Sequence, residues 1–394
     1  MKNILKFTII FFITLGFTSC SLDDDGNVIG PTGNSKTYAL VSVDDPNIFG
    51  TARFIENSNN STTVELELVG TPSGGMHPAH IHFNSAAEGG DIAVTLGTVD
   101  GSTGFSTVIV SELDDGNPIT YDQLITFDGY INVHLSASDL GTLVAQGDIG
   151  ENELTGESKV YALDSVDDPA ISGTATFQER VNGEALAIID LENTTDGAMH
   201  PAHIHANTAA EGGDIVFTFN SIDGTTGVSK TNVDAIAYVD ILDYDGYINV
   251  HLSSSDLGTL VAQGDIGQNE LTGESKVYVL NSVDVPTASG TATFEERVNG
   301  EALATLDIIN SVDGEMHPAH IHAGSVATAP GAILFTFNSV DGTTGVSKTN
   351  VSALDDDTAF GYDDVLTADG YINVHFSAAN LATLVAQGDI GINE

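Results

Sequence analysis

The sequence predicts an all-β protein, consisting of three tandem antiparallel β-sandwich or barrel domains after a lipoprotein signal peptide. Three observations predict this. A short apolar segment near the N-terminus ends on the only cysteine of the chain. The remainder repeats itself three times, and such self-similarity indicates tandem structural units. Each repeat contains short runs of β-branched and aromatic residues separated by turn dipeptides, which is typical of antiparallel sheets.

The N-terminal segment has the features of an export signal. Its apolar run, Phe7–Phe17, is too short to cross a bilayer, and the small residues Thr18 and Ser19 precede Cys20. We therefore expect residues 1–19 to be a signal peptide. The segment resembles a bacterial lipobox, with phenylalanine in place of the usual leucine, and the resemblance implies that Cys20 is lipidated. An ordinary signal peptide with a chance cysteine is the alternative.

Residues 20–30 are interpreted as an acidic linker after the lipidated cysteine. The run Asp23–Asp25 resembles the export signal that directs Bacteroidetes lipoproteins to the cell surface. This resemblance implies a protein in the outer membrane, held by a lipid anchor on Cys20 and exposed at the cell surface. A plain solvated linker is the alternative.

The composition excludes several functions. Ten Lys and Arg stand against 56 Asp and Glu, a formal charge of −46, which repels nucleic acid and anionic membranes. Cys20 is the only cysteine, so neither disulfides nor thiol catalysis can operate in the mature domains. Nucleic acid is therefore excluded as a partner, and a metal ion or an extracellular ligand is expected.

The repeat boundaries follow from matching ends. The units open on Pro31–Lys36 and on two Leu-Thr-Gly-Glu-Ser-Lys segments, and each closes on Gln-Gly-Asp-Ile-Gly, one variable residue, Asn and Glu. The units are 31–153, 154–270 and 271–394, here called repeats 1, 2 and 3. Their length of about 120 residues suits one compact domain each, so we expect them to fold independently.

Repeat 2 illustrates the expected strands. Its β-rich runs are Lys159–Leu163, Ser172–Phe177, Ala185–Leu191, Asp214–Phe219 and Gly246–Leu252. Asn-Gly and Asp-Gly dipeptides lie between them and predict turns. Helical periodicity is weak, and its best candidate is a turn at Ser253–Leu260.

Histidines are the most informative residues, because all twelve fall into two motifs that occur once per repeat. The first motif is Met-His-Pro-Ala-His-Ile-His, and the second is Gly-Tyr-Ile-Asn-Val-His. The candidate metal ligands are His77, His80, His82, His134, His200, His203, His205, His251, His317, His320, His322 and His375.

Strand geometry explains the spacing of the first motif. Side chains alternate between the faces of a strand, so His80 and His82 share one face while Ile81 points into the core. Pro78 biases His77 toward an extended conformation, from which it can approach the same patch.

In the second motif Ile131, Val133 and Leu135 form an apolar face, which leaves Asn132 and His134 on the polar one. If the two strands are neighbours, three or four imidazoles converge. Imidazole nitrogens on a rigid sheet suit copper or zinc, which we expect as the cofactor. The alternative is that the histidines only form hydrogen bonds in a recurrent turn.

His-Ile-His, the Gly-Tyr-Ile-Asn-Val-His strand and a closing Gly-x-Leu-Val-Ala-Gln-Gly together resemble the CHRD domain, first described in chordin, across all three repeats. Leu143 to Gln146 departs from the Glu and Arg usual in that family. The resemblance implies a β-sandwich without an established enzymatic activity, and for bacterial members it suggests adhesion or ligand binding at the cell surface.

A second resemblance is to Cu/Zn superoxide dismutase, in which His-x-His precedes a later strand histidine. It implies copper positions for His80, His82 and His134. The chain departs from that family because it lacks the further zinc ligands, the cysteine pair and an arginine after the last histidine, and its acidity opposes steering of superoxide. Enzymatic activity is therefore uncertain, and the sequence favours a non-enzymatic protein.

The sequence thus indicates a surface lipoprotein that binds a transition metal through four histidines per domain. A structural or adhesive module without metal and a dismutase-like copper enzyme are the alternatives. Repeat 1 has Glu88 and Asp91 after its histidines and repeat 2 has Glu211 and Asp214, whereas repeat 3 has no acid there. If these carboxylates orient the imidazoles, repeat 3 binds metal more weakly. The alternative is that they only solvate a loop.

Overall fold

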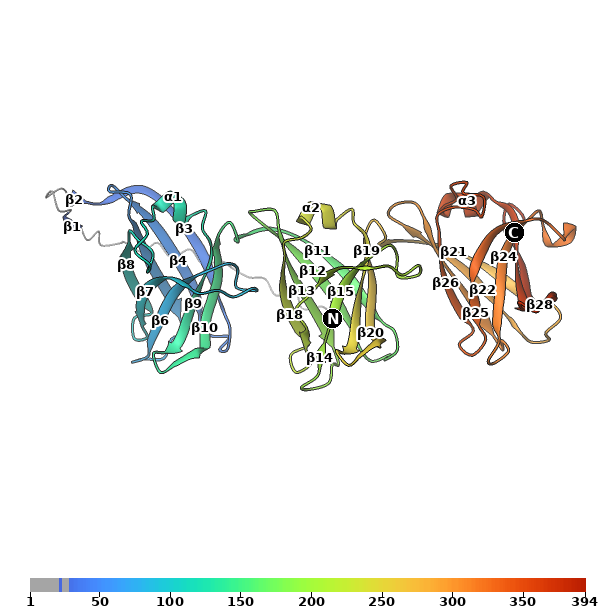
Figure 1. Ribbon diagram of the computed structural model, residues 1–394, viewed down its shortest axis with the longest axis horizontal. Coiled ribbons are helices and arrows are strands. Elements are labelled where there is room, and N and C mark those ends of the chain that lie inside the picture. Colours follow the sequence, from blue (N-terminus) through green and yellow to red (C-terminus); the bar gives the residue numbers. More distant parts are fainter. Residues whose placement is uncertain (1–20, 23–27) are drawn as a thin grey trace, which may run out of the picture. The chain divides into compact units, whose positions relative to one another are not determined.

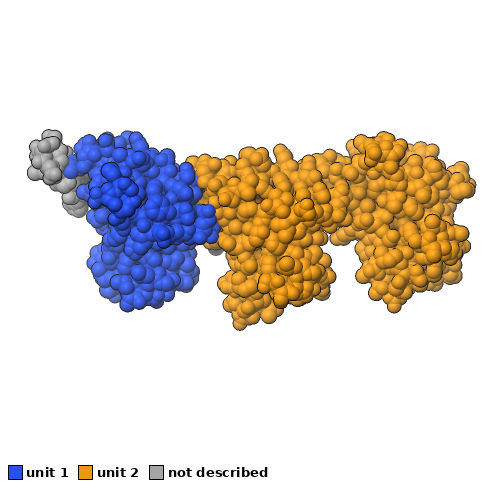
Figure 2. Space-filling model, in the orientation of Figure 1, with its two compact units in different colours: residues 1–154 blue, residues 155–394 orange. Residues whose placement is uncertain are grey.

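The computed structural model describes residues 21–22 and 28–394, and it confirms the all-β class (Figure 1). The predicted signal peptide, Cys20 and the Asp23–Asp25 run lie outside the described residues. Within the described ranges, no helix has the length and apolar character needed to cross a membrane. The chain divides into two compact units, residues 1–154 with repeat 1 and residues 155–394 with repeats 2 and 3 (Figure 2).

Repeat 1 is a closed antiparallel barrel with strand order β10-β3-β4-β5-β8-β7-β6-β9. Its strands are β3 (Pro31–Ser42), β4 (Phe49–Asn57), β5 (Thr62–Val69), β6 (Met76–Phe83), β7 (Ile92–Asp100), β8 (Phe105–Val110), β9 (Asp128–Ser136) and β10 (Asp139–Gly150). A two-stranded ribbon of β1 (Ser21–Leu22) and β2 (Val28–Ile29) precedes it, and one short helix, α1 (Tyr121–Leu124), lies between β8 and β9.

Repeat 2 forms a ten-stranded sheet in the order β14-β17-β18-β13-β12-β11-β20-β19-β15-β16. Its elements are β11 (Leu154–Ser165), β12 (Ser172–Arg180), β13 (Ala185–Glu192), β14 (Met199–His200), β15 (Ala202–Ala206), β16 (Ile215–Thr218), β17 (Ile222–Asp223), β18 (Val228–Val233), α2 (Tyr238–Ile241), β19 (Asp245–Ser253) and β20 (Asp256–Gly267).

Repeat 3 forms an eight-stranded sheet in the order β25-β24-β27-β28-β21-β22-β23-β26. Its elements are β21 (Leu271–Ser282), β22 (Ser289–Arg297), β23 (Ala302–Ile309), β24 (Met316–Ala323), η1 (Val326–Thr328), β25 (Ile333–Asp341), β26 (Val346–Val351), α3 (Tyr362–Thr367), β27 (Asp369–Ser377) and β28 (Asn380–Gly391).

Alternation of apolar and polar residues builds each core. In β5 the side chains of Val64, Leu66 and Leu68 are buried, while Glu65 and Glu67 between them face outward. Each repeat has its own cluster of buried apolar side chains. Burying this surface stabilises the fold without disulfides, at roughly 25 cal/mol per Å² of apolar area.

The predicted runs of repeat 2 lie on β11, β12, β13, β16 and β19. The predicted helical turn at Ser253–Leu260 is wrong. Ser253 and Asp256 are paired across a tight hairpin, and the main-chain N–H of Asp256 donates to Ser253 Oγ. A two-residue connection closes this hairpin, so the apolar residues after it continue as β20.

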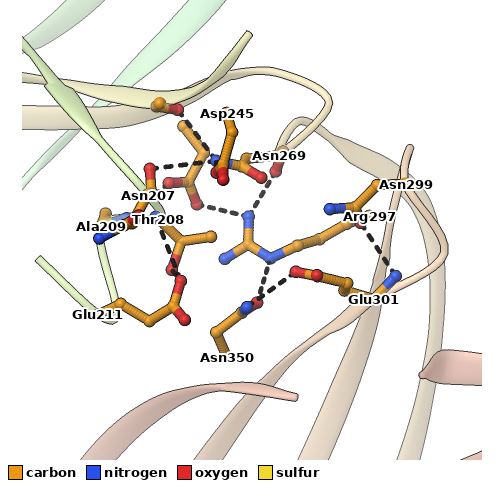
Figure 3. A network of polar contacts seen from close by, with 12 residues as sticks. Asn207, Thr208, Ala209, Glu211, Asp245, Asn269, Arg297, Asn299, Glu301 and Asn350 are labelled. Atoms are coloured by element: carbon orange, nitrogen blue, oxygen red, sulfur yellow. Dashed lines mark hydrogen bonds and ion pairs between the residues drawn. The ribbon is translucent and has the colours of Figure 1, made fainter. Parts of the chain in front are cut away.

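A buried arginine joins repeats 2 and 3 within the second unit (Figure 3). Arg297, at the end of β22, is 0% exposed. Its Nη1 donates to Asp265 Oδ2 of β20 at 2.7 Å and to the main-chain oxygen of Asn269, and its Nε donates to Asn350 Oδ1 at 2.9 Å. A buried charge requires such partners, so this network holds the two repeats together.

Candidate metal centre

Three histidines of each repeat converge on one face of its sheet. Strand β6 pairs with β9, and His80 lies opposite Asn132, two residues before His134. One ligand nitrogen from each of the three side chains lies within 4.8 Å of the others. The same trios recur in repeats 2 and 3: His203, His205 and His251, and His320, His322 and His375. The prediction that the strands of the two motifs are neighbours in the sheet is therefore confirmed.

The strands position these side chains through alternation, and irregularities in register lie beside them. Ile81 is buried in the core, so its neighbours His80 and His82 point to the opposite side. The pairing of β6 with β7 shifts register next to both His80 and His82, and the pairing of β9 with β10 shifts between Val133 and His134. In each shift the extra residue belongs to the partner strand, Leu96 and Ala93 in β7 and Val144 in β10. The partner strands therefore bend locally, while the histidine strands keep their alternation.

The hydrogen bonds of two imidazoles determine which nitrogen is free to bind. His82 Nδ1 lies 2.9 Å from the main-chain oxygen of Gly90, and His134 Nδ1 lies 2.7 Å from that of Leu140. A carbonyl oxygen only accepts, so Nδ1 carries the proton in both neutral rings and the Nε2 lone pair is free. His80 completes the set through Nδ1, which lies 3.1 Å from His134 Nε2.

This donor pattern is repeated almost unchanged. In repeat 2 the distances are 2.9 Å for His205 Nδ1 to Gly213 O, 2.8 Å for His251 Nδ1 to Leu257 O and 3.1 Å for His251 Nε2 to His203 Nδ1. In repeat 3 they are 3.0 Å for His322 Nδ1 to Gly331 O and 2.7 Å for His375 Nδ1 to Leu381 O. Each trio therefore offers one Nδ1 and two Nε2 atoms.

A tyrosine fixes the middle ligand. The rings of His82 and Tyr130 stack with centroids 5.0 Å apart and an interplanar angle of 18°. The Tyr130 hydroxyl accepts from the N–H of Gly90, whose carbonyl in turn holds His82. Tyr247 and Tyr371 stack in the same way in the other repeats. The sequence did not predict that the tyrosine positions the histidine, although the tyrosine is present in all three Gly-Tyr-Ile-Asn-Val-His motifs.

Burial favours the neutral form of two ligands in each trio. Loss of hydration lowers the pKa of the first and third histidine of each trio below 6.5, and nearby imidazoles lower it further. These residues are His80, His134, His203, His251, His320 and His375. Neutral imidazole is the form that binds a metal ion, so the trios are prepared to bind at neutral pH.

The fourth histidine of each repeat lies outside the trio. His77 is 1% exposed, and its Nδ1 donates to the main-chain oxygen of His134 at 3.2 Å. His200 bonds to His251 O in the same way, and His317 bonds to Phe376 O. Met76 beside His77 is 56% exposed, so its thioether points away from the core.

Glu88, one of the carboxylates expected to orient the imidazoles, forms hydrogen bonds elsewhere. Glu88 Oε2 accepts from the N–H and Oγ of Ser85, while the Gly90 carbonyl holds His82. Gly331 supplies the same carbonyl in repeat 3, where the acids are absent. Glu88 therefore gives no reason for a weaker site in repeat 3.

Comparison with known proteins finds no family model, no curated protein and no solved structure that matches the chain.

Proposed function

We propose that each repeat binds one copper or zinc ion through its histidine trio, and that the chain is a lipid-anchored metal-binding protein of the cell surface. The carrying observation is that three ring nitrogens converge in each repeat, and that at least one of them is buried without a hydrogen-bond partner among the described residues. The second histidine shows this in all repeats: Nε2 of His82, His205 and His322. In repeat 3, His320 Nδ1 and His375 Nε2 are also without a partner.

Such nitrogens favour a cation. A buried polar atom without a partner costs about 1–3 kcal/mol, and a bound cation removes that cost. Zinc binds imidazole at about 2.0–2.1 Å in tetrahedral geometry, which places two ligand nitrogens about 3.4 Å apart. The separation of 3.1 Å between His80 Nδ1 and His134 Nε2 is close to that value. An all-nitrogen set suits copper and zinc best among the first-row metals.

The remaining parts of the proposal rest on the sequence. The N-terminal signal with Cys20 supports a lipid anchor, and the resemblance to CHRD domains supports a binding module rather than an enzyme. An excess of 46 negative charges raises the local concentration of cations. The histidine trios then select transition metals among these cations, which a diffuse negative charge does not.

A copper enzyme is a second candidate, because three protein ligands leave one coordination position for water or a substrate. The acidity of the chain counts against superoxide as that substrate. A module whose histidines serve only the fold accounts for the main-chain bond of His77 Nδ1. It does not account for the convergence of three ring nitrogens in every repeat.

The test is the metal content of the full chain, purified without a histidine tag and dialysed against zinc or copper. We expect three equivalents per chain by elemental analysis. A variant with His80→Ala, His203→Ala and His320→Ala should retain none, and circular dichroism should show that it remains folded. Equal metal in the two proteins would overturn the proposal. Consumption of superoxide by the copper-loaded chain would favour the copper enzyme over a metal-binding protein without activity.

A further inference from the structure

The segment between β8 and α1 differs in length from at least one of its counterparts, which follow β18 in repeat 2 and β26 in repeat 3. Ten residues separate Val110 from Tyr121, and ten separate Val351 from Tyr362. Only four separate Val233 from Tyr238 in repeat 2. Repeats 1 and 3 thus share a loop that repeat 2 lacks, and each shared loop is closed by an isolated bridge, between Glu112 and Pro118 in repeat 1.

This loop fastens a carboxylate to the strand beside the metal centre. The N–H of Asp114 donates to Ala93 O at 2.9 Å. Asp114 Oδ1 accepts from the N–H of Thr95 at 3.0 Å, and its Oδ2 accepts from Thr95 Oγ1 at 2.7 Å. Leu113 packs against the core and anchors the loop. Both carboxylate oxygens are engaged, so the charge has a fixed position.

That position adjoins the first ligand. Thr95 of β7 is the cross-strand partner of His80 in β6, and directly opposed residues share a face with Cβ atoms about 4.5–5.5 Å apart. Repeat 3 has the same arrangement: Asp355 accepts from the N–H and Oγ1 of Thr336 at 2.9 and 2.8 Å, and Thr336 is the partner of His320. No carboxylate is in the groups whose ligand atoms lie within 4.8 Å, so these aspartates act from outside the trio.

Repeat 2 has the threonine without the carboxylate. Thr218 lies opposite His203, and no described carboxylate bonds to it. Strand β16 is also more exposed than its counterpart β7. Val216 is 40% exposed, whereas Ala93 at the equivalent position of repeat 1 is 2% exposed.

We propose that Asp114 and Asp355 are affinity-determining residues that strengthen the binding of a divalent cation in repeats 1 and 3, which leaves repeat 2 as the weakest and most readily exchanged site. The inference rests on the proposed function and refines it. A fixed negative charge attracts a doubly charged ion through the partly buried sheet face. We expect zinc to bind about 3- to 10-fold more weakly in repeat 2, by screened Coulomb attraction over several ångströms.

The test is a zinc titration of the full chain against a chromophoric chelator. The wild-type chain should bind three equivalents, two tightly and one more weakly. Asp114→Asn with Asp355→Asn removes the charge and can retain both contacts, because Oδ1 accepts from the threonine N–H and Nδ2 can donate to its Oγ1. Three equivalents of similar, weaker affinity are therefore expected. Asp115→Asn with Asp356→Asn removes two charges from the same loops and should leave the two classes intact. Raising the salt concentration should reduce the difference in zinc affinity between the two classes of site, because salt screens the charge of the aspartates.

The outcomes are distinguishable. No binding at all would overturn the proposed function itself. Three equivalents of equal affinity in the wild-type chain would overturn only the inference about the aspartates. An equal effect of the Asp114/Asp355 and the Asp115/Asp356 variants would overturn it as well, because net charge would then explain the change. Circular dichroism of each variant verifies the fold.

Discussion

The imidazole Nδ1 of His77 donates to the main-chain oxygen of His134 at 3.2 Å, which fastens the start of β6 to the third ligand of the trio. His77 is therefore a positioning residue, and His77→Leu should lower the free energy of unfolding by about 1–3 kcal/mol, because the buried carbonyl loses its donor. His77→Asn should cost less, since its amide Nδ2 can replace Nδ1 as the donor. Chemical unfolding followed by circular dichroism measures both.

Metal content separates this role from a ligand role. If His77 only positions the backbone, His77→Asn should still bind three equivalents of zinc. Loss of one equivalent in this variant, with the stability unchanged, would place His77 among the ligands.

Stability of the metal-free chain should depend on pH through the trios. Burial lowers the pKa of His80 and His134 below 6.5, so these residues take up protons at a lower pH when folded than when unfolded. As the pH falls through 6.5, the unfolded state binds more protons and the free energy of unfolding decreases. The decrease continues until the folded imidazoles are also protonated.

Unfolding by urea between pH 8 and pH 5 measures this effect. The His80→Ala, His203→Ala, His320→Ala variant lacks one such histidine per repeat and serves as the reference, since its carboxylates titrate as in the wild type. The wild-type chain should lose more stability than the variant below pH 6.5. Parallel curves would refute the assignment.

Much of the site could be predicted from the sequence, because it depends on local rules. Alternation along a strand is sufficient to place His80 and His82 on one face and Ile81 in the core. The same rule fails at Leu135, which is exposed although it was assigned to the apolar face with Val133. Leu135 is the penultimate residue of β9, next to the hairpin that joins β9 to β10, where the buried part of the strand has ended.

Other features depend on contacts between distant segments. Alternation places His77 on the side of Ile81 and away from His80, but the sequence does not show that its Nδ1 bonds to the main-chain oxygen of His134. The carbonyl of Gly90 holds His82 because of how the loop folds back, so a search for polar side chains could not find it. The loop of Asp114 was visible as a difference in length, but its relation to His80 requires the register of β7.

The proposed lipid anchor on Cys20 predicts where the protein is found. Cys20→Ser should prevent acylation and release the chain from the membrane fraction, since acyl chains supply the attachment. If the acidic run after Cys20 directs export to the surface, protease added to intact cells should degrade the wild-type protein. Degradation only after lysis would place the protein on the inner leaflet of the outer membrane.

Arg297 should determine whether repeats 2 and 3 unfold together. The side chain is fully buried and pairs with Asp265 at 2.7 Å, so Arg297→Ala leaves a partly buried carboxylate without its counter-charge. Removing one member of a buried pair typically costs about 3–5 kcal/mol. Repeat 1 has Asn57 at the equivalent position, where its Nδ2 donates to Ser61 and Thr63 of the same repeat.

An exposed pair provides the control. Arg53 and Glu65 lie 3.4 Å apart with side chains 49% and 32% exposed, so Arg53→Ala should change stability by less than about 1 kcal/mol. Because the chain contains no tryptophan, circular dichroism is the better probe of unfolding by urea. Arg297→Ala should shift the transition to lower urea and separate repeats 2 and 3 into two steps. Equal, small effects of both variants would show that the buried network does not couple the repeats.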